Sequence, residues 1–260
     1  MIFDTHMHCN NSCDSHMTFA EAIAEADRKK IGITVTEHWD YDYPTNPEAF
    51  LFDLDKYFQE LQPLCNNQVL IGLEIGMQKH IAAEDDKIAA AYAFDYVLAS
   101  IHCVNRKDIY EKSFYLNKEK ADVVREYLED AIICVQEHDN YDAFAHIDYI
   151  CRYWPYENKE FEFQQHQQLF DKLFLSLIHK NKPLEINTRR LDNPEAVKAL
   201  LTLYQRYKYL GGRYCTLGSD AHYKEHVGRR MDTALQIARA SALEPVYFKQ
   251  RKMHLLGERL

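Results

Sequence analysis

The first eight residues, MIFDTHMH (1–8), contain the pattern on which the prediction of the fold depends: a short apolar run that ends in two histidines. Similar runs recur along the chain, and longer stretches with the period of an amphipathic helix separate them. Such alternation is typical of βα units whose strands form a parallel sheet. The expected strands cover residues 1–6, 31–38, 69–76, 95–102, 142–149, 183–188 and 214–220.

Helical periodicity fills the stretches between these strands. The first expected helix, 18–30, begins with Thr18 and has Glu21 three residues later, which is the sequence of a capping box. No linker or change in composition divides the chain, so we expect residues 1–260 to form one domain, either a closed barrel or a doubly wound sheet. Further helices are expected over 53–64, 84–93, 117–138, 163–180, 194–210 and 231–242.

The composition excludes several classes of protein. The chain has 260 residues, of which 47% are hydrophobic, so it can bury a full core and is not disordered. Its 31 basic and 40 acidic residues give a net charge of −9, which argues against non-specific binding to nucleic acid or anionic membranes. Seven cysteines without a CxxC pair are interpreted as reduced thiols.

Neither a signal peptide nor a membrane span is expected. Asp4, His6 and His8 fall where a signal peptide would need an apolar core. No apolar run approaches the roughly 18 residues of a membrane-spanning helix. We therefore expect a cytoplasmic protein with no membrane or nucleic-acid partner, and the sequence leaves its oligomeric state open.

Residues of the types that bind metals lie at or near the C-terminal ends of six of the seven expected strands. The sixth strand, which ends in EINT, has none there. In a parallel barrel these ends open on one face, so residues far apart in the sequence converge. His6 and His8 are two residues apart and point to the same side of a strand, as do Asp220 and His222. The candidate ligands are His6, His8, Asp14, His38, Glu74, His102, His146, Asp220 and His222.

Imidazoles and carboxylates without thiolates suit Zn, Mn or Fe in an open, catalytic site. Nine ligands exceed what one ion can hold, so we expect two or three divalent metal ions that share a carboxylate. Taken singly, His146 could be a core histidine, Glu74 part of a buried ion pair, and Asp14 a turn former. The remaining seven histidines are assigned to no site: His16, His80, His138, His166, His179, His226 and His254.

The ordered motifs THMH, TEH, GLEIG, SIH, FAHID and GSDAH resemble those of the polymerase-and-histidinol-phosphatase (PHP) family between residues 4 and 222. The resemblance implies a distorted seven-stranded (β/α) barrel, TIM-like in type, and a metal-dependent phosphoesterase with up to three ions. Glu37 replaces the usual Asp before His38. We expect Glu37 at most to contact the residues that bind metal, and not to bind a metal itself. The implied ligand sets are His6, His8, Glu74 and Asp220; Glu74, His102 and His146; and Asp14, His38 and His222.

Within the family, the stretches GLEIG, DYVLASIHCV, AHIDYICRY and LEINT are similar to the branch of stand-alone histidinol-phosphate phosphatases. This similarity implies hydrolysis of L-histidinol phosphate to L-histidinol and phosphate in histidine biosynthesis. Relatives often continue LEINT with Ser-Gly, whereas this chain has Arg189 and Arg190. The departure leaves the phosphate contacts of this loop open.

Hydrolysis of a phosphate monoester needs a nucleophile and neutralisation of charge on the phosphoryl oxygens. A water that bridges two cations beside Glu74 would have a lowered pKa and could attack as hydroxide. Asp220 could both bind metal and accept the proton of this water. The planar fork of arginine suits the remaining phosphate oxygens, and the candidates are Arg152 and Arg190, with Arg189 as the alternative to Arg190.

Three other functions compete with this interpretation. The first is a PHP phosphatase or phosphodiesterase that acts on another small phosphate ester or on a nucleotide. The second is a barrel that binds metal without catalysis, which the intact ligand set disfavours. The third is a metal-dependent amidohydrolase, whose barrels also use His-x-His, but no lysine on the expected strands is placed to be carbamylated.

Overall fold

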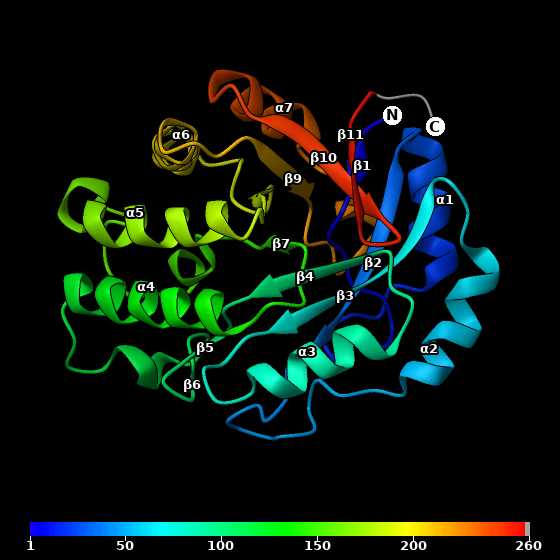
Figure 1. Cartoon of the computed structure of the whole chain (residues 1–260), viewed down its shortest axis with the longest axis horizontal. Coiled ribbons are helices and arrows are strands. Elements are labelled where there is room, and N and C mark those ends of the chain that lie inside the picture. Colours follow the sequence, from blue (N-terminus) through cyan, green and yellow to red (C-terminus); the bar gives the residue numbers. More distant parts are fainter. Residues whose placement is uncertain (258–260) are drawn as a thin grey trace.

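The computed structural model describes residues 1–257 and is built around a mostly parallel sheet with helices on its outer face (Figure 1). Neighbours in the sheet follow the order of the chain, apart from the separate β5–β6 hairpin, and β11 runs antiparallel to β10. The strands are β1 (Phe3–Asp4), β2 (Gly32–Trp39), β3 (Val69–Gly76), β4 (Tyr96–Ser100), β5 (Cys103–Val104), β6 (Lys107–Asp108), β7 (Ala143–Phe144), β8 (Leu184–Asn187), β9 (Tyr214–Gly218), β10 (Glu244–Lys249) and β11 (Lys252–Leu255).

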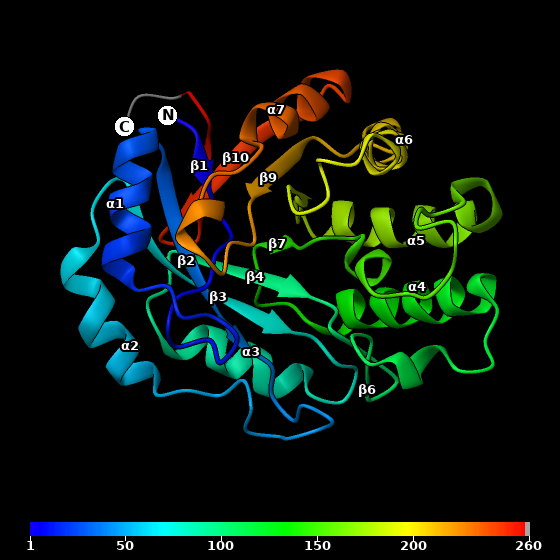
Figure 2. The same ribbon diagram turned by 180° about the vertical axis from the view of Figure 1, so that it is seen from behind.

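Seven α-helices within residues 1–257 connect the strands, and the view from behind shows them on the periphery as well (Figure 2). None of these helices is long and apolar enough to span a membrane. The α-helices are α1 (Phe19–Lys29), α2 (Leu54–Leu61), α3 (Ala82–Ala91), α4 (Lys120–Glu137), α5 (Phe163–His179), α6 (Pro194–Tyr209) and α7 (Met231–Ala240). The 3-10 helices are η1 (Gln62–Leu64), η2 (Lys112–Tyr115), η3 (Tyr149–Arg152) and η4 (Lys224–His226).

The alternation of strands and helices predicted from the sequence is confirmed. All seven expected strands form, and β3 has the predicted bounds, although β1 and β7 contain only two residues each. The capping box at the start of α1 is also present: Glu21 N donates to Thr18 Oγ1 at 3.2 Å, and Thr18 N donates to Glu21 Oε2 at 3.0 Å. The hairpins β5–β6 and β10–β11 were not predicted.

The segment that follows β1 is hydrogen-bonded to the end of β9 and to the residues after it. Thr5 N donates to Leu217 O, His8 N donates to Ala221 O, and Asp220 N donates to His6 O, each at 2.8 Å. Met7 and Ala221 form a parallel bridge in the same stretch. These bonds link the first strand of the sheet to a strand near its other end, and they place residues 6–8 beside residues 220–222.

Apolar side chains fill the N-terminal ends of the strands. The ring of Phe248 on β10 stacks on Tyr96 at the start of β4, with ring centroids 5.4 Å apart, and Tyr247 stacks on Phe3 of β1 at 4.1 Å. The rings of Tyr96, Phe248 and Phe3 are buried, and burying a side chain of this size stabilises the fold by about 1.5–3 kcal/mol. The candidate ligands lie at or just beyond the opposite, C-terminal ends.

A buried polar pair joins α3 to the end of α4. Asp85 Oδ2 lies 3.0 Å from His138 Nε2, and neither side chain is exposed. Because a carbonyl oxygen can only accept, His138 Nδ1 donates to Cys134 O at 2.9 Å. Burial raises the pKa of Asp85 to about 6, although His138 acts in the opposite direction.

The substitution Asp85→Asn tests this pair, because the amide keeps the shape of the carboxyl and can donate to His138 Nε2. A carboxyl with a pKa of about 6 in the fold, above its ordinary 3.8, contributes stability that is present below pH 4 and lost as the pH rises through 6. We expect the free energy of unfolding of the variant, relative to the unsubstituted protein, to rise by up to about 3 kcal/mol between pH 4 and pH 8.

Chemical denaturation at several pH values measures this difference. Glu84→Gln, at an exposed position of the same helix, is the matched control and should show little change with pH. A difference between Asp85→Asn and the unsubstituted protein that stays constant with pH would contradict the raised pKa of Asp85.

Candidate metal centre

The buried carboxylate of Glu74 lies at the centre of the predicted cluster. Glu74 on β3 is paired in register with His38 on β2, and residues paired in this way point to the same face of a sheet. Ser100 Oγ, on the next strand, donates to Glu74 Oε1. The five imidazole nitrogens nearest to the Glu74 oxygens lie 2.9–3.6 Å away and belong to His6, His8, His38, His102 and His146.

Asp220, two residues after the end of β9, provides a second carboxylate in the cluster. Its Oδ1 lies 3.5 Å from His222 Nδ1, 3.6 Å from His8 Nε2 and 3.9 Å from His6 Nε2. Its Oδ2 accepts a hydrogen bond from Arg152 Nη1 at 2.6 Å. One oxygen of Asp220 therefore faces the histidines while the other is held by an arginine.

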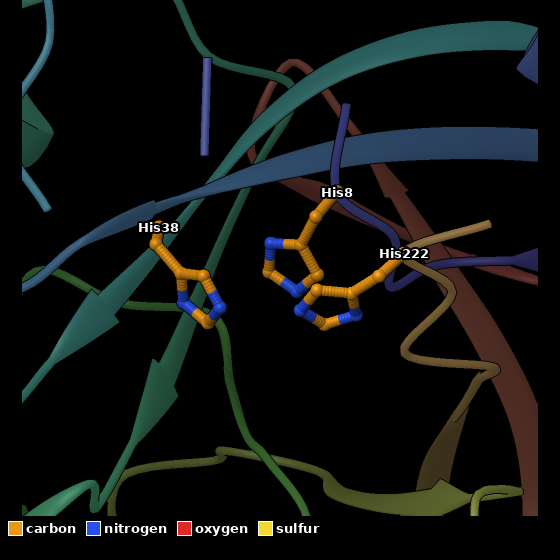
Figure 3. Close-up of side chains that lie close together, drawn as sticks. All are labelled: His8, His38 and His222. Carbon is orange, nitrogen blue, oxygen red and sulfur yellow. The ribbon is translucent and has the colours of Figure 1, made fainter. Parts of the chain in front are cut away.

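The imidazoles of His8, His38 and His222 gather at one side of the cluster (Figure 3). The ring centroids of His8 and His38 are 3.9 Å apart, and those of His8 and His222 are 4.4 Å apart. Asp14 Oδ2 lies 3.1 Å from His222 Nε2 and 3.6 Å from His38 Nε2. Because the side chain of Asp14 is 44% exposed, this side is where the centre opens to solvent.

The structure brings all nine predicted ligands together. Asp14 lies beside two of the others, and none of the seven unassigned histidines, all within the described chain, joins a group. His38 belongs to two groups, whereas the family resemblance implies only the set with Asp14 and His222. The groups whose ligand atoms lie within 4.8 Å of one another are His8, His38 and His222; His6, His8 and Glu74; His6, His146 and Asp220; and His38, Glu74 and His102.

Two further carboxylates orient ligand imidazoles, and neither was predicted from the sequence. Glu185 Oε1 on β8 lies 2.8 Å from His6 Nδ1, and Asp40 Oδ1 lies 2.7 Å from His102 Nδ1. A carboxylate at Nδ1 fixes the tautomer of an imidazole and directs its Nε2 into the centre. The sixth expected strand thus contributes to the site through Glu185, and a charged residue inside the apolar run PLEIN was the signal that could have revealed it.

Both of these carboxylates pass over a glycine to reach their histidine. A Cβ at Gly76, at the end of β3, would overlap with the carboxylate of Asp40. A Cβ at Gly218, at the end of β9, would overlap with Glu185 Oε1 and lie 2.5 Å from the Cβ of His6. Gly76 and Gly218 are therefore required by the close approach of side chains.

Glu37 organises the loop that follows His8 without entering the ligand groups. It accepts hydrogen bonds from Cys9 N at 3.0 Å, from Ser12 N at 3.1 Å and from Ser12 Oγ. Ser12 Oγ in turn lies 3.3 Å from His8 Nδ1 and accepts from His38 N at 3.0 Å. Glu37 reaches two ligands through Ser12, in agreement with the role expected for it.

The two central carboxylates are ionised at neutral pH. Burial alone would raise the pKa of Glu74, but the surrounding histidines, His6 first, outweigh burial and hold this pKa well below its ordinary value. Burial likewise opposes ionisation of Asp220, and the charge of Arg152 holds the pKa of Asp220 well below its usual range. Anionic oxygen ligands are therefore present at the pH of a cell.

The residues present fit divalent metal ions. Glu74 Oε2 and His102 Nε2 are buried and have no aligned hydrogen-bond partner in residues 1–257, although His38 Nδ1 approaches Glu74 Oε2 to 2.9 Å. A buried polar atom without a partner costs about 1–3 kcal/mol. Bound cations would remove this cost, and a donor set of imidazole nitrogens and carboxylate oxygens suits Zn, Mn or Fe.

Of the two arginines predicted to bind substrate, only Arg152 lies at the centre. Besides Asp220, its guanidinium contacts Asn187 Oδ1 at 3.1 Å and lies 4.9 Å from the ring centroid of Tyr149. Its side chain is only 8% exposed. Arg152 therefore combines a fixed position with direct contact to a candidate ligand.

Arg190, the other predicted substrate contact, is paired with carboxylates outside the ligand groups. Its guanidinium donates to Asp148 Oδ2 at 3.0 Å and to Glu160 Oε1 at 2.5 Å, so two carboxylates outside the ligand groups already occupy it. Arg189, the stated alternative to Arg190, lies nearer the centre: its Nη1 donates to Asp220 O at 3.1 Å and lies 3.5 Å from His222 Nδ1. The choice of one neighbour over the other depends on side-chain direction, which the sequence does not reveal.

Known proteins are similar to this chain in sequence and in fold. A protein of Clostridium acetobutylicum named "Probable histidinol-phosphatase" is 42% identical over 253 residues, which cover 97% of this chain and 99% of that protein. A "Histidinol-phosphatase" of Lactococcus lactis subsp. lactis is 36% identical over 231 residues, which cover 84% of this chain and 83% of that protein.

A crystal structure of histidinol phosphate phosphatase from Lactococcus lactis subsp. lactis, complexed with zinc, L-histidinol and phosphate, superposes with a TM-score of 0.91. The superposition covers 97% of this chain and 98% of the other at 31% sequence identity. The family model described as the PHP domain matches residues 4–189. These matches confirm the resemblance inferred from the motifs, and the chain belongs to the polymerase-and-histidinol-phosphatase (PHP) family.

Proposed function

We propose that this chain is a metal-dependent phosphatase that hydrolyses L-histidinol phosphate to L-histidinol and phosphate in histidine biosynthesis. The observation that carries the proposal is the buried carboxylate of Glu74, which has five imidazole nitrogens within 3.6 Å. The names of the relatives at 42% and 36% identity support the substrate. So does the similar crystal structure, which holds zinc together with both products of this reaction.

Two or three divalent ions, Zn, Mn or Fe, would be held by the nine ligands, with Glu74 shared between two of them. When bound, such ions activate water as a nucleophile and neutralise charge on the phosphoryl oxygens. Glu185 and Asp40 would keep the Nε2 atoms of His6 and His102 directed into the centre during turnover. Asp14, as the most exposed ligand, borders the opening through which an ester would enter.

The hydrogen bonds between residues 5–8 and 217–221 support a closed fold, the distorted seven-stranded barrel. In this description β1, β2, β3, β4, β7, β8 and β9 form the ring, and the β10–β11 hairpin packs against its N-terminal end. The ring would make the chain one domain with one active site, at the C-terminal ends of the strands.

In the reaction, the oxygen of water forms a bond to phosphorus and the ester P–O bond breaks. Asp220 Oδ1, directed at the histidines and ionised at neutral pH, accepts the proton that the water loses. Arg152 and Arg189, on either side of Asp220, bind the phosphoryl oxygens and orient the ester. The leaving alkoxide is released as the alcohol after it takes up a proton.

Steady-state kinetics with the metal-loaded protein test the substrate. We expect kcat/KM for L-histidinol phosphate to exceed that for sugar phosphates, nucleotides and p-nitrophenyl phosphate by at least about tenfold, because the site must also recognise the alcohol. Removal of metal by a chelator should abolish activity, and added zinc or manganese should restore it. Preference for another ester would identify a different phosphatase of the family, and full activity after chelation would contradict the metal centre.

The substitution Glu74→Gln keeps the shape of the side chain but removes the charge that ions would share. We expect dialysed protein to lose about two ions per chain together and kcat to fall at least about a hundredfold. Elemental analysis and turnover are measured on the same samples, with the exposed Glu129→Gln as control. Retention of most of the metal and turnover would show that Glu74 is not a shared ligand.

A comparison of Arg189→Gln with Arg190→Gln tests which of the two arginines binds the substrate. Loss of Arg189 should raise the KM for the ester at least about tenfold, since hydrogen bonds to charged groups contribute about 1.5–3 kcal/mol. Loss of Arg190 leaves Asp148 and Glu160 without their cationic partner. It should lower the free energy of unfolding by about 3 kcal/mol, with little change in KM. The reverse pattern would restore Arg190 as the substrate contact.

A further inference from the structure

Arg229, in the loop between η4 and α7, is a partly buried cation without an anionic partner. Its Nε and Nη2 atoms are buried and donate to no acceptor within residues 1–257, and no carboxylate oxygen in that range lies within 4.0 Å of the guanidinium nitrogens. The next residue, Arg230, is paired with Asp192 at 3.0 Å. The two neighbouring arginines therefore differ in whether their charge is compensated.

The charges around Arg229 are mostly of its own sign. Burial, followed by the charges of Arg189 and Arg230, lowers the pKa of Arg229 to about 10, and Arg152 acts in the same direction. Asp220 is the anion that opposes this change. Arg229 stays protonated at neutral pH, and an uncompensated buried charge of this kind destabilises a fold unless an anion joins it.

The unpaired edge of Arg229 has the geometry that binds two oxygens at once. Nε and Nη2 form the side of the guanidinium that pairs with a carboxylate through parallel hydrogen bonds. Arg28 uses this edge for Glu25, at 2.8 and 2.7 Å, and Arg206 uses it for Asp171 at the same distances. In Arg229 the same edge is unused.

The loop that carries Arg229 is held in place by the fold. Gly228 N donates to Asp4 Oδ2 at 2.7 Å, two residues before the ligand His6, and Arg229 N donates to His226 O at 3.0 Å. Gly228 has a φ of 64°, in the left-handed region that favours glycine. Helix α7 begins two residues after Arg229, and Asp4 Oδ1 accepts from Ser219 N at 2.8 Å, so Asp4 links this loop to the residue before Asp220.

We propose that Arg229 is a third binding residue for the phosphate group of the ester and of the product, together with Arg152 and Arg189. Because its free edge is buried, the side chain must turn about its own torsions toward Asp220, and pairing with an anion favours that turn. Phosphate brings two negative charges and several acceptor oxygens, which suit three guanidinium groups. The assignment rests on the proposed function for the identity of the ester.

The test uses the zinc-loaded full chain and inorganic phosphate as the probe. The phosphate Kd is measured by calorimetry, the KM with L-histidinol phosphate, and the Tm with and without phosphate. We expect Arg229→Gln to raise both Kd and KM at least about tenfold, which corresponds to about 1.4 kcal/mol. Arg229→Lys keeps the charge but loses the planar fork. We expect its Kd and KM to lie between those of the unsubstituted protein and those of Arg229→Gln.

Arg213→Gln is the matched control, with the same change of charge at an exposed arginine that is paired with Glu244 at 2.9 Å, and should leave Kd and KM within about twofold. A structural arginine would lower the Tm when it is removed. Arg229→Gln should instead keep or raise the Tm without phosphate and lose most of the increase that phosphate causes. Zinc content must be equal in all variants, so that lost metal does not imitate lost phosphate binding.

Unchanged Kd and KM in Arg229→Gln, or a lower Tm with an unchanged response to phosphate, would overturn the inference. If the unsubstituted protein bound phosphate through Arg229 but did not hydrolyse L-histidinol phosphate, the anion site would stand and the proposed function would fail. The two conclusions are therefore tested separately.

Discussion

The pairing of residues 5–8 with residues 217–221 is the constraint on which the metal centre depends. It joins segments that are 212 positions apart at Thr5 and Leu217. His6 and His8 lie on one segment and Asp220 lies on the other, so without this pairing the ligands would have no common location. Asp4 strengthens the junction, because its carboxylate accepts from Ser219 N and Gly228 N at 2.8 and 2.7 Å.

The part of the site that topology determines could be predicted from the sequence. Parallel strands present their C-terminal ends at one edge whatever their exact twist. Histidines and carboxylates at these ends were therefore expected to converge, and the structure brings Glu74, His38 and Asp220 together as that reasoning requires. Local signals were equally informative for the start of α1, where the Thr18–Glu21 capping box needs no tertiary context.

Features that depend on side-chain direction could not be predicted. Glu185 supports His6 because β8 and β9 are paired so that the carboxylate of Glu185 passes over Gly218. Predicting this contact would require the strand register and the side-chain rotamer, and the sequence reveals neither. Arg189 and Arg190 are adjacent and chemically identical, yet only the position of Asp148 and Glu160 decides which of them is already occupied. The strands β10 and β11 lie beyond the last predicted helix, where the helix–strand alternation gave no reason to expect a hairpin.

The carboxylates that hold His6 and His102 have a consequence for the lifetime of the protein. The conformational entropy of ordering these imidazoles is lost during folding, so an arriving ion does not bear that cost. In the chain without ions, buried ligand atoms such as Glu74 Oε2 and His102 Nε2 lack aligned hydrogen-bond partners, which destabilises the native state. Ions that bind the native state alone draw the unfolding equilibrium toward it by mass action. Bound divalent ions would therefore make the native chain more resistant to unfolding, in addition to any part they take in the chemistry.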